Sequence, residues 1–222
     1  MHTLRLYLIA VVKDKHGRVV RVHRQRSRSF VKNFMEFLKG IMTAQQVAIS
    51  TTLVSSPWSD AVNLATIIDE SGAQQILQTK RCGPAGETVY LALLGVNAPQ
   101  GDDTWGIVVG KGTTAPTPND YALENKYPHG DGDGYLNYGA TTISDITVSN
   151  KEVYFTITRV FTNNGSAKQT VTEAGVIARY AMGYYGLDQD IKFLIIRDIL
   201  TSSLDIPAQG TCAIKYKVKI IT

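Results

Sequence analysis

The sequence predicts a mainly β protein, and three observations carry this prediction. Glycine is abundant (19 of 222 residues), and β-branched residues and tyrosines outnumber strong helix formers in most segments. Apolar and polar residues alternate with period two in many short segments, which is typical of strands with one buried face. Turn residues recur between these segments. We therefore predict a β-sandwich with a jelly-roll-like strand order and one amphipathic helix near the N-terminus.

The fold prediction rests mainly on residues 151–180, KEVYFTITRVFTNNGSAKQTVTEAGVIARY. In an extended chain, Val153, Phe155 and Ile157 point to one side, so the first half reads as a strand with one apolar face. Asn163-Asn164-Gly165 follows, and these residue types tolerate the positive φ angles of a tight turn. A second apolar strand comes after them. The segment therefore predicts a β-hairpin.

Shorter segments that alternate or are apolar throughout predict further strands, and residues 4–11, which are apolar on both faces, predict a buried one. The segments lie at residues 4–11, 18–23, 46–54, 61–69, 74–79, 89–94, 105–109, 135–138, 143–148, 193–199 and 214–220. In the last of these, three lysines alternate with apolar residues, which predicts a solvated face and suits the edge of a sheet. Residues 110–134 contain three prolines and little periodicity, so we expect a long loop that is functional or supported by a partner.

One amphipathic helix is predicted at Ser29–Met42, with Ser27 or Ser29 as its N-terminal cap. Its apolar stripe contains Phe30, Phe34, Phe37, Leu38 and Ile41. Such a helix covers an open end of the β domain or, alternatively, docks a neighbouring subunit.

The charge is unevenly distributed. Residues 1–42 contain ten basic and two acidic residues, giving +8, whereas the whole chain carries +4 and the remainder therefore −4. We predict a basic hairpin plus helix at residues 1–42 and a β-sandwich at residues 43–222, with one continuous domain as the alternative. The basic-surface candidates are Arg18, Arg21, Arg24, Arg26 and Arg28. Two oppositely charged parts suggest two surfaces with different partners.

Nucleic acid is an alternative partner that the sequence does not favour. The basic residues at 13–32 could contact phosphates, but no aromatic residue is interleaved with them before Phe30. A solvated face or an acidic protein partner is the preferred interpretation. No segment has the roughly 18 apolar residues of a membrane-spanning helix, and the N-terminal apolar run lacks the features of a signal peptide, so no membrane partner is expected.

Two glycine-rich segments resemble ligand-binding loops without matching them. Asp131 and Asp133 alternate with glycines like part of a calcium loop, but Thr142 occupies the position of the distal glutamate, so they are weak metal candidates. A phosphate loop requires four residues between its first glycine and a Gly-Lys-Ser/Thr triplet. In residues 106–114 the lysine, Lys111, precedes Gly112, and prolines follow where a helix should begin. We predict no cofactor.

The sequence shows no catalytic arrangement, and we predict that the protein is not an enzyme. Its four histidines are scattered. Glu173 and Asp198 lie in apolar strands, where a structural ion pair with Arg159, Arg179 or Arg197 is preferred over an acid/base pair. Cys82 and Cys212 are expected to be reduced and partly buried, with a disulfide as the alternative.

Six motifs follow one another from Ser29 onward. They are SFVKNF (29–34), GIVVGKGTTAP (106–116), DYAL (120–123), RVFTNNG (159–165), VTEAG (171–175) and LIIRDIL (194–200). In this order they resemble structural proteins of tailed viruses of bacteria and archaea, of tail or capsid-accessory type. The resemblance implies a non-enzymatic virion protein, made in the host cytoplasm, that binds other copies of itself and other virion proteins. Rings or trimers are the expected symmetry.

The predicted subunit contacts lie in the helix and in the long loop. The candidates are Phe30, Phe34, Phe37, Leu38, Tyr121, Leu123 and Tyr127. One alternative is a receptor- or carbohydrate-binding module at a tail tip, with Trp58, Trp105, Tyr184 and Tyr185 as stacking residues. Another is a β-sandwich hydrolase, which would require Glu173, Asp198 or Asp205 to converge in a cleft.

Overall fold

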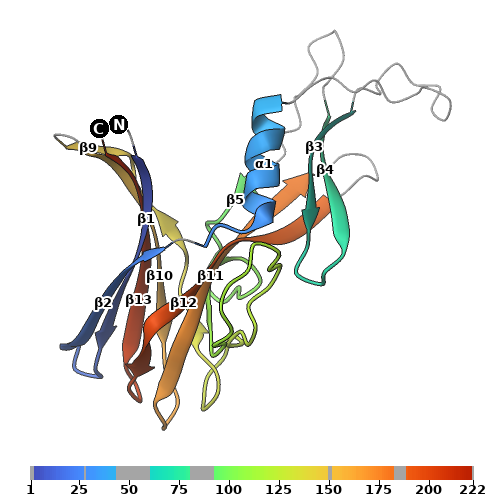
Figure 1. Ribbon diagram of the computed structural model, residues 1–222. Helices are drawn as coiled ribbons and strands as arrows, with labels where there is room; N and C mark the ends of the chain where they lie inside the picture. The colour runs from blue at the N-terminus through green and yellow to red at the C-terminus, as the bar shows by residue number, and fades with distance from the viewer. Residues whose placement is uncertain are drawn as a thin grey trace.

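A computed structural model describes residues 3–27, 29–43, 61–80, 93–149, 152–182 and 189–221. The fold is mainly β, with antiparallel sheets and the helix α1 (Lys32–Thr43) near the N-terminus (Figure 1). This confirms the predicted β class and the predicted helix. The strand predicted at 46–54, and most of the one predicted at 89–94, lie outside the described residues.

The largest sheet, sheet A, joins the two ends of the chain. It contains β1 (Thr3–Lys13), β2 (Val19–Ser27), β7 (Asn137–Tyr138), β8 (Thr142–Ile143), β9 (Thr147–Ser149), β10 (Glu152–Thr162) and β13 (Thr211–Ile221), in the order β2-β1-β13-β10, with β7, β8 and β9 each pairing with β10. β1 pairs with β13 along its whole length. The basic N-terminal hairpin and the C-terminal strand therefore share a sheet, and the division at residue 42 stays a prediction.

Two further sheets lie within the described part of the chain. Sheet B contains β5 (Leu93–Gly95), β6 (Gly106–Gly110), β11 (Gln169–Met182) and β12 (Gln189–Ile206). Sheet C is the hairpin of β3 (Ala61–Ile68) and β4 (Gln74–Lys80). In its predicted turn, the Asp69 carboxylate accepts the N–H groups of Ser71 and Ala73, and Gly72 supplies a φ of 83°.

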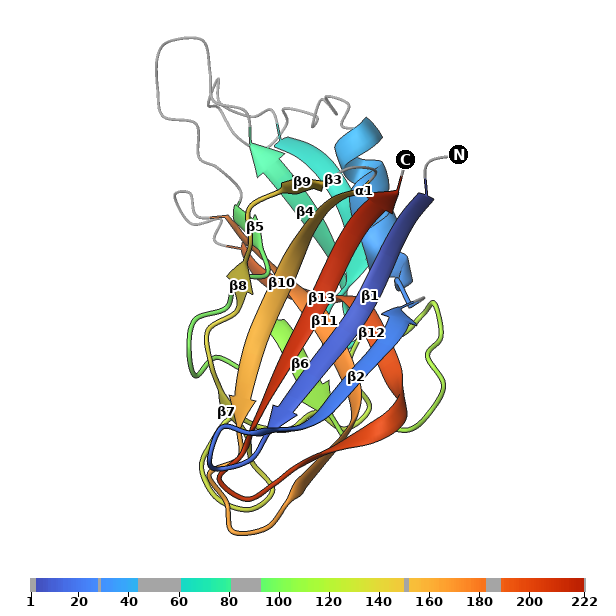
Figure 2. The same cartoon turned by 90° about the vertical axis from the view of Figure 1, so that its left-hand side faces the viewer.

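Sheets A and B share one apolar core. Alternate side chains of sheet A, such as Leu8 and Tyr216, pack with Val176 and Leu194 of sheet B, and sheet A lies in front of sheet B in Figure 2. A second, smaller core lies where α1 and sheet C cover the other end of β11 and β12, and there Phe37 packs beside Phe193. The helix thus covers β structure, as in the first of its two alternative roles. The jelly-roll order stays a prediction.

The hairpin predicted at residues 151–180 is wrong. β10 and β11 are both strands, as the alternation predicts, but β10 belongs to sheet A and β11 to sheet B. Asn163-Asn164-Gly165 does not adopt the positive φ angles that a tight hairpin turn requires. Instead, the buried Asn163 amide donates to the carbonyls of Ile206 and Pro207 (3.1 and 3.0 Å). The Asn163 side chain thereby links the β10–β11 connection to the β12–β13 connection.

The helix begins at Lys32, later than predicted, and neither candidate serine caps it. The residues before it pair with β12 instead: Phe30 forms a β-bridge with Ile196, and the Ser29 carbonyl accepts the N–H of Arg197 (3.1 Å). These backbone partners keep the chain extended up to Val31. Phe30 nevertheless stacks on Phe34 with ring centroids 4.3 Å apart.

The edge position predicted for the last strand is also wrong. β13 lies between β1 and β10, in the middle of sheet A. Its alternating lysines share the outer face of the sheet, where Lys219 is only 8% exposed and pairs with Glu152 (2.6 Å). Alternation reports which face is polar, but not where the strand lies in its sheet. The strand predicted at 143–148 is likewise two short strands, β8 and β9.

Candidate functional site

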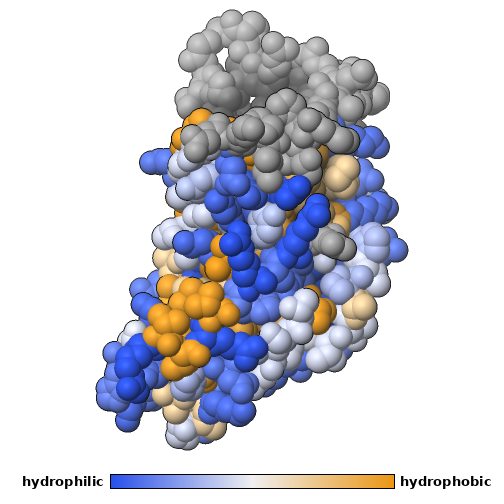
Figure 3. All heavy atoms as spheres, turned by 60° about the vertical axis from the view of Figure 1, so that its left-hand side comes forward, coloured by the Kyte–Doolittle hydropathy of each residue, from blue (hydrophilic) through white to orange (hydrophobic). Residues whose placement is uncertain are grey.

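An apolar patch lies on the outer face of sheet A. One row crosses four strands, because Val22 pairs with Val11, Val11 with Ala213, and Ala213 with Val160. Val22 is 63% exposed, and Val160 and the neighbouring Val20 are 42% and 53% exposed. Figure 3 shows apolar residues gathered beside a strongly hydrophilic area. We call Val11, Val20, Val22, Val160 and Ala213 the apolar patch.

The basic-surface candidates do not form one surface. Arg24 and Arg26 lie on the outer face of sheet A, since they pair with Ile9 and Tyr7. Arg21 points to the other side, where its guanidinium donates to the Ser202 hydroxyl (2.8 Å). Arg18 lies beside the turn and pairs with Asp14 (2.7 Å). Arg28 lies outside the described residues.

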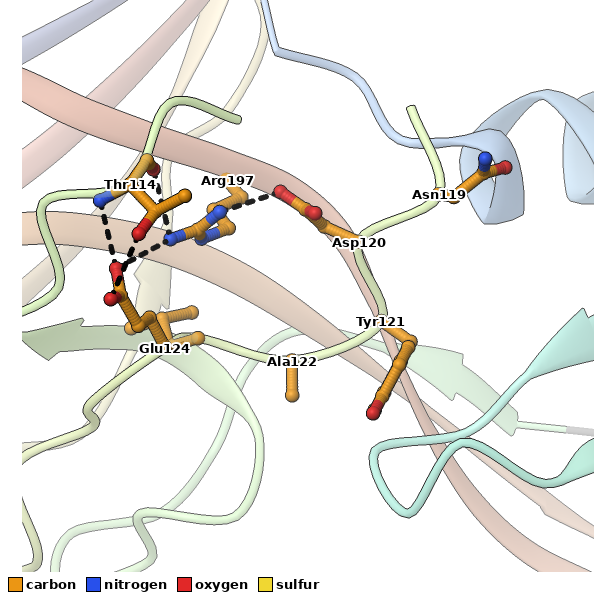
Figure 4. Close-up of a pocket in the computed structure, with 8 residues that line it drawn as sticks. Thr114, Asn119, Asp120, Tyr121, Ala122, Glu124 and Arg197 are labelled. Carbon is orange, nitrogen blue, oxygen red and sulfur yellow. Dashed lines mark hydrogen bonds and ion pairs between the residues drawn. The ribbon is translucent and has the colours of Figure 1, made fainter. Parts of the chain in front are cut away.

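Residues from three of the sequence motifs converge on Arg197. This nearly buried guanidinium on β12 contacts Asp120 through Nη1 (2.7 Å) and Glu173 through Nε (3.2 Å). Its Nη2 lies 3.5 Å from Glu124 (Figure 4). Of the three arginines predicted as structural partners of Glu173, Arg197 is the one found. A single cation therefore holds carboxylates from the long loop and from β11.

Glu173 explains the glycines that resemble a phosphate loop. Its fully buried carboxylate accepts the N–H groups of Gly112 (3.0 Å) and Asn125 (2.8 Å). A Cβ atom at Gly110 or Gly112 would lie 2.5 Å from Oε1 of Glu173. The two glycines thus make room for an internal carboxylate.

An open pocket of about 380 Å³ lies beside this network. It is lined by Thr114, Asn119, Asp120, Tyr121, Ala122, Leu123, Glu124 and Arg197. Tyr121 is 43% exposed and lies on the side of the pocket away from Glu124 (Figure 4). The other two loop residues predicted at a subunit contact, Leu123 and Tyr127, are buried, and the Tyr127 hydroxyl donates to the Thr170 carbonyl. Of these three, Tyr121 is available at the surface.

The charges of the network support one another. Burial alone would raise the pKa of Asp120, but hydrogen bonds from Thr117 and Arg197 outweigh it and hold this pKa below its ordinary value. Burial likewise disfavours the charged Arg197, but the hydrogen bond and charge of Asp120 and the charge of Glu173 raise its pKa. Asp120 and Arg197 are therefore both ionised at neutral pH.

This network predicts acid lability. The pKa of Asp120 is lower in the folded chain than the ordinary 3.8, so its stabilisation is complete above that pH and is lost as the pH falls through the folded value. The unfolding free energy of the unmodified protein should therefore fall as the pH is lowered from about 4 to about 2. That of Asp120→Asn should fall by about 1 kcal/mol less over the same range. Urea unfolding across this range measures the difference. Asp145→Asn, at an exposed position, is the control, and parallel pH profiles for Asp120→Asn and the unmodified protein would contradict the prediction.

The two weak metal candidates hold a loop in place. Asp133 accepts the N–H groups of Ser166 and Ala167 (both 2.9 Å), and Asp131 accepts the Asn164 amide (2.6 Å). Hydrogen bonds of this kind lower the pKa of both carboxyl groups. Within the described part of the chain, no group of three or more His, Cys, Asp or Glu side chains is placed to hold a metal ion.

Arg159 is a second buried arginine, and its partners are backbone carbonyls. The guanidinium donates to the carbonyl oxygens of Pro99, Asp102, Trp105, Ile107 and Gly139. Burial lowers its pKa to about 10, so it remains charged at neutral pH. Arg159 therefore fastens β10 of sheet A to the segment that leads into β6 of sheet B. The sequence shows an arginine in an apolar strand but gives no sign of its carbonyl partners.

Further candidate residues belong to the carbohydrate-binding and hydrolase alternatives. Trp105 is buried and donates to Asp102 (2.7 Å), whereas Trp58, Tyr184 and Tyr185 lie outside the described residues. Asp205 pairs with Lys168 (2.8 Å) at the surface, and Asp198 is buried.

Of the two cysteines, Cys212 is a buried free thiol whose pKa burial raises to about 12, and Cys82 lies outside the described residues.

Comparison with family models, with curated proteins and with solved structures finds no match to this chain. Among the described residues, no helix has the length and apolar character needed to cross a membrane.

Proposed function

We propose that this chain is a non-enzymatic structural protein of a virion, a tail component or a capsid decoration or accessory subunit, that assembles in multiple copies. The order of the sequence motifs supports the viral context, and the apolar patch on sheet A supports assembly. We also propose that sheets A and B form a β-sandwich, since their inner faces share one core.

The apolar patch is the observation that carries the proposal. Monomeric proteins rarely expose large contiguous apolar patches, and such patches mark contacts with partners. The patch spans four strands of one sheet and is therefore presented on a rigid surface.

A second copy of the chain suits this surface on grounds of charge. The basic side chains beside the patch would repel the same face of another copy. Residues 93–149 carry seven acidic and two basic residues, a charge of −5. A contact between the outer face of one copy and this segment of the next is heterologous, and heterologous contacts close into rings when the rotation allows it.

The double substitution Val20→Thr/Val22→Thr tests the patch. Threonine keeps a β-branched shape that suits a strand but removes apolar surface from the contact. We expect the unmodified protein to form a multi-copy species whose mass falls at high salt, because charges at the contact are screened. The variant should need about tenfold higher concentration to assemble. Light scattering at low and high salt measures both effects.

The control is Leu4→Thr/Ile76→Thr, which changes two exposed aliphatic residues outside both the apolar patch and residues 93–149. It should assemble like the unmodified protein. Equal weakening by both double variants would show that the patch has no special role. A monomer at all concentrations in both buffers would remove self-assembly from the proposal.

The pocket beside Arg197 supports a second candidate, a carbohydrate- or receptor-binding module. Tyr121 presents an exposed ring on one side of the pocket, and the carboxylates of Asp120 and Glu124 line the same pocket. Sugar rings combine apolar faces with hydroxyl donors. Glycan-array binding that Tyr121→Ala abolishes would favour this function over the first.

A further inference from the structure

The outer face of sheet A brings together basic and aromatic residues that are far apart in the sequence. Directly paired residues in neighbouring strands share a face, so the pairing register defines its members. They are Arg5 and Tyr7 on β1, Arg24 and Arg26 on β2, Tyr154 on β10, and Lys215, Lys217 and Lys219 on β13. We call these eight residues the cationic face. The core residues of the same strands point the other way.

The cationic face carries a concentrated positive charge. It holds six basic side chains, and Glu152 is the acidic residue on the outer side of β1, β2, β10 and β13. Glu152 pairs with Lys219 and Lys217 (2.6 and 3.5 Å). The net charge of this surface is therefore +5, and Arg24, Arg26 and Lys215 are exposed. An anionic partner, either a nucleic acid or an acidic polypeptide, suits a surface of this charge.

The tyrosines distinguish between anionic partners. Arg24 and Lys219 lie over the ring of Tyr7, 5.2 and 5.1 Å from its centroid, and Lys217 lies 3.5 Å above the ring of Tyr154. A cation therefore already lies over each ring, and both tyrosines are partly exposed. Proteins that bind single-stranded nucleic acid combine such rings, on which bases stack, with cations that contact phosphates. An acidic polypeptide would use the cations but not the rings.

The dimensions of the surface also suit an extended strand. Lys215, Lys217 and Lys219 alternate along one β-strand, so their Cα atoms span about 14 Å, and the neighbouring strands lie about 4.8 Å to each side. The surface is a sheet face with cations in three successive rows, long enough to contact several phosphates at once.

We propose that the cationic face binds single-stranded nucleic acid through its phosphates, without sequence preference, and that Tyr7 and Tyr154 stack with bases. This site is distinct from the apolar patch, which lies farther along the same strands toward the β1–β2 turn. The sequence alone does not favour nucleic acid because no aromatic residue is interleaved with the basic residues at 13–32 before Phe30. In the fold, Tyr7 of β1 pairs with Arg26, and Tyr154 of β10 pairs with Lys219.

The hairpin contains a matched pair of variants for the test. Arg24→Gln/Arg26→Gln removes two charges from the cationic face, and Arg18→Gln/Arg21→Gln removes two charges from the same hairpin but from other surfaces. Binding of the full chain to a fluorescein-labelled oligothymidylate is followed by fluorescence anisotropy over a series of salt concentrations. Thermal unfolding checks that each variant is folded.

We expect the unmodified protein to bind, with an affinity that falls steeply as salt rises. Arg24→Gln/Arg26→Gln should weaken binding about tenfold and reduce the slope of log affinity against log salt by about 1.4, the value for two lost contacts on a single strand. Arg18→Gln/Arg21→Gln should change the affinity less than about twofold. Tyr154→Leu should weaken binding while leaving the salt slope unchanged, because stacking releases no counterions.

Three results would overturn the proposal. The first is no binding at low salt, and the second is equal weakening by the two double variants, which would indicate a general effect of net charge. The third is competition by poly-glutamate or by duplex DNA as effective as that by unlabelled oligothymidylate. Effective competition by poly-glutamate would assign the surface to an acidic protein instead.

Discussion

Arg159→Met is expected to destabilise the protein by about 3–5 kcal/mol. The guanidinium is fully buried and donates to five backbone carbonyls, which come from the segment before β6, from β6 itself and from the residue after β7. Methionine fills a similar volume but donates no hydrogen bond, so these carbonyls would be left without their partner. Each unsatisfied buried polar group costs about 1–3 kcal/mol, and relaxation recovers part of the sum. Chemical denaturation measures the loss.

Two comparisons separate this effect from a general loss of charge. Arg159→Lys keeps the charge but cannot reach all five carbonyls with one ammonium group, so it should fall between methionine and the unmodified protein. Arg179→Met removes an arginine that pairs with Asp190 at the surface (2.7 Å) and should cost less than about 1 kcal/mol. A loss below about 1 kcal/mol for Arg159→Met would mean that water satisfies the carbonyls.

The substitution Glu173→Leu should have an effect of similar size, about 3–5 kcal/mol. Glu173 accepts hydrogen bonds from Arg197 and from the N–H groups of Gly112 and Asn125. Removing it leaves a nearly buried guanidinium with less compensating charge and three N–H groups, including that of Glu124, without an acceptor. Glu173→Gln keeps one acceptor oxygen and should be less destabilising. Urea or guanidinium unfolding ranks the two variants.

A double-mutant cycle shows whether the loss comes from the ion pair. Arg197→Met alone leaves Glu173 buried without its cation, so it too should be strongly destabilising. The double variant Glu173→Leu/Arg197→Met removes both charges and should be more stable than the sum of the two single losses predicts, by about 1–3 kcal/mol. Strict additivity would show that the two side chains act independently.

The alternation of apolar and polar residues predicts most of the strands, but it does not predict which sheet each strand joins. Alternation in residues 152–162 correctly places Phe155 and Ile157 on one side of a strand. The same alternation cannot say which strand lies next to it. The Asn163-Asn164-Gly165 sequence suits a hairpin turn, yet the buried Asn163 amide bonds to a connection more than forty residues later in the chain. Side-chain period is a property of a few adjacent residues, whereas strand pairing is decided by distant ones.

For the candidate sites too, the sequence predicts local features but not which distant residues come together. The sequence marks Glu173 as a buried carboxylate with an arginine partner, because a charge in an apolar strand must be compensated. It cannot choose between three arginines. Nor can it show that Tyr154 lies on the same face of a sheet as Arg24 and Arg26, since more than 120 residues separate Tyr154 from these arginines.

The pairing of β1 with β13 has a consequence for how the protein is made. The ribosome releases residues 3–13 long before residues 211–221 exist, so during synthesis the apolar side of β1, which includes Leu6 and Leu8, lacks its central neighbour. Contacts between the two extremes of a chain also slow folding, because a long loop must close before they form. Sheet A is therefore completed only when the last strand emerges. A polypeptide that stops before residue 211 lacks β13, which lies between β1 and β10, and lacks the β13 lysines. Contacts that use the complete outer face of sheet A are therefore restricted to chains that include β13.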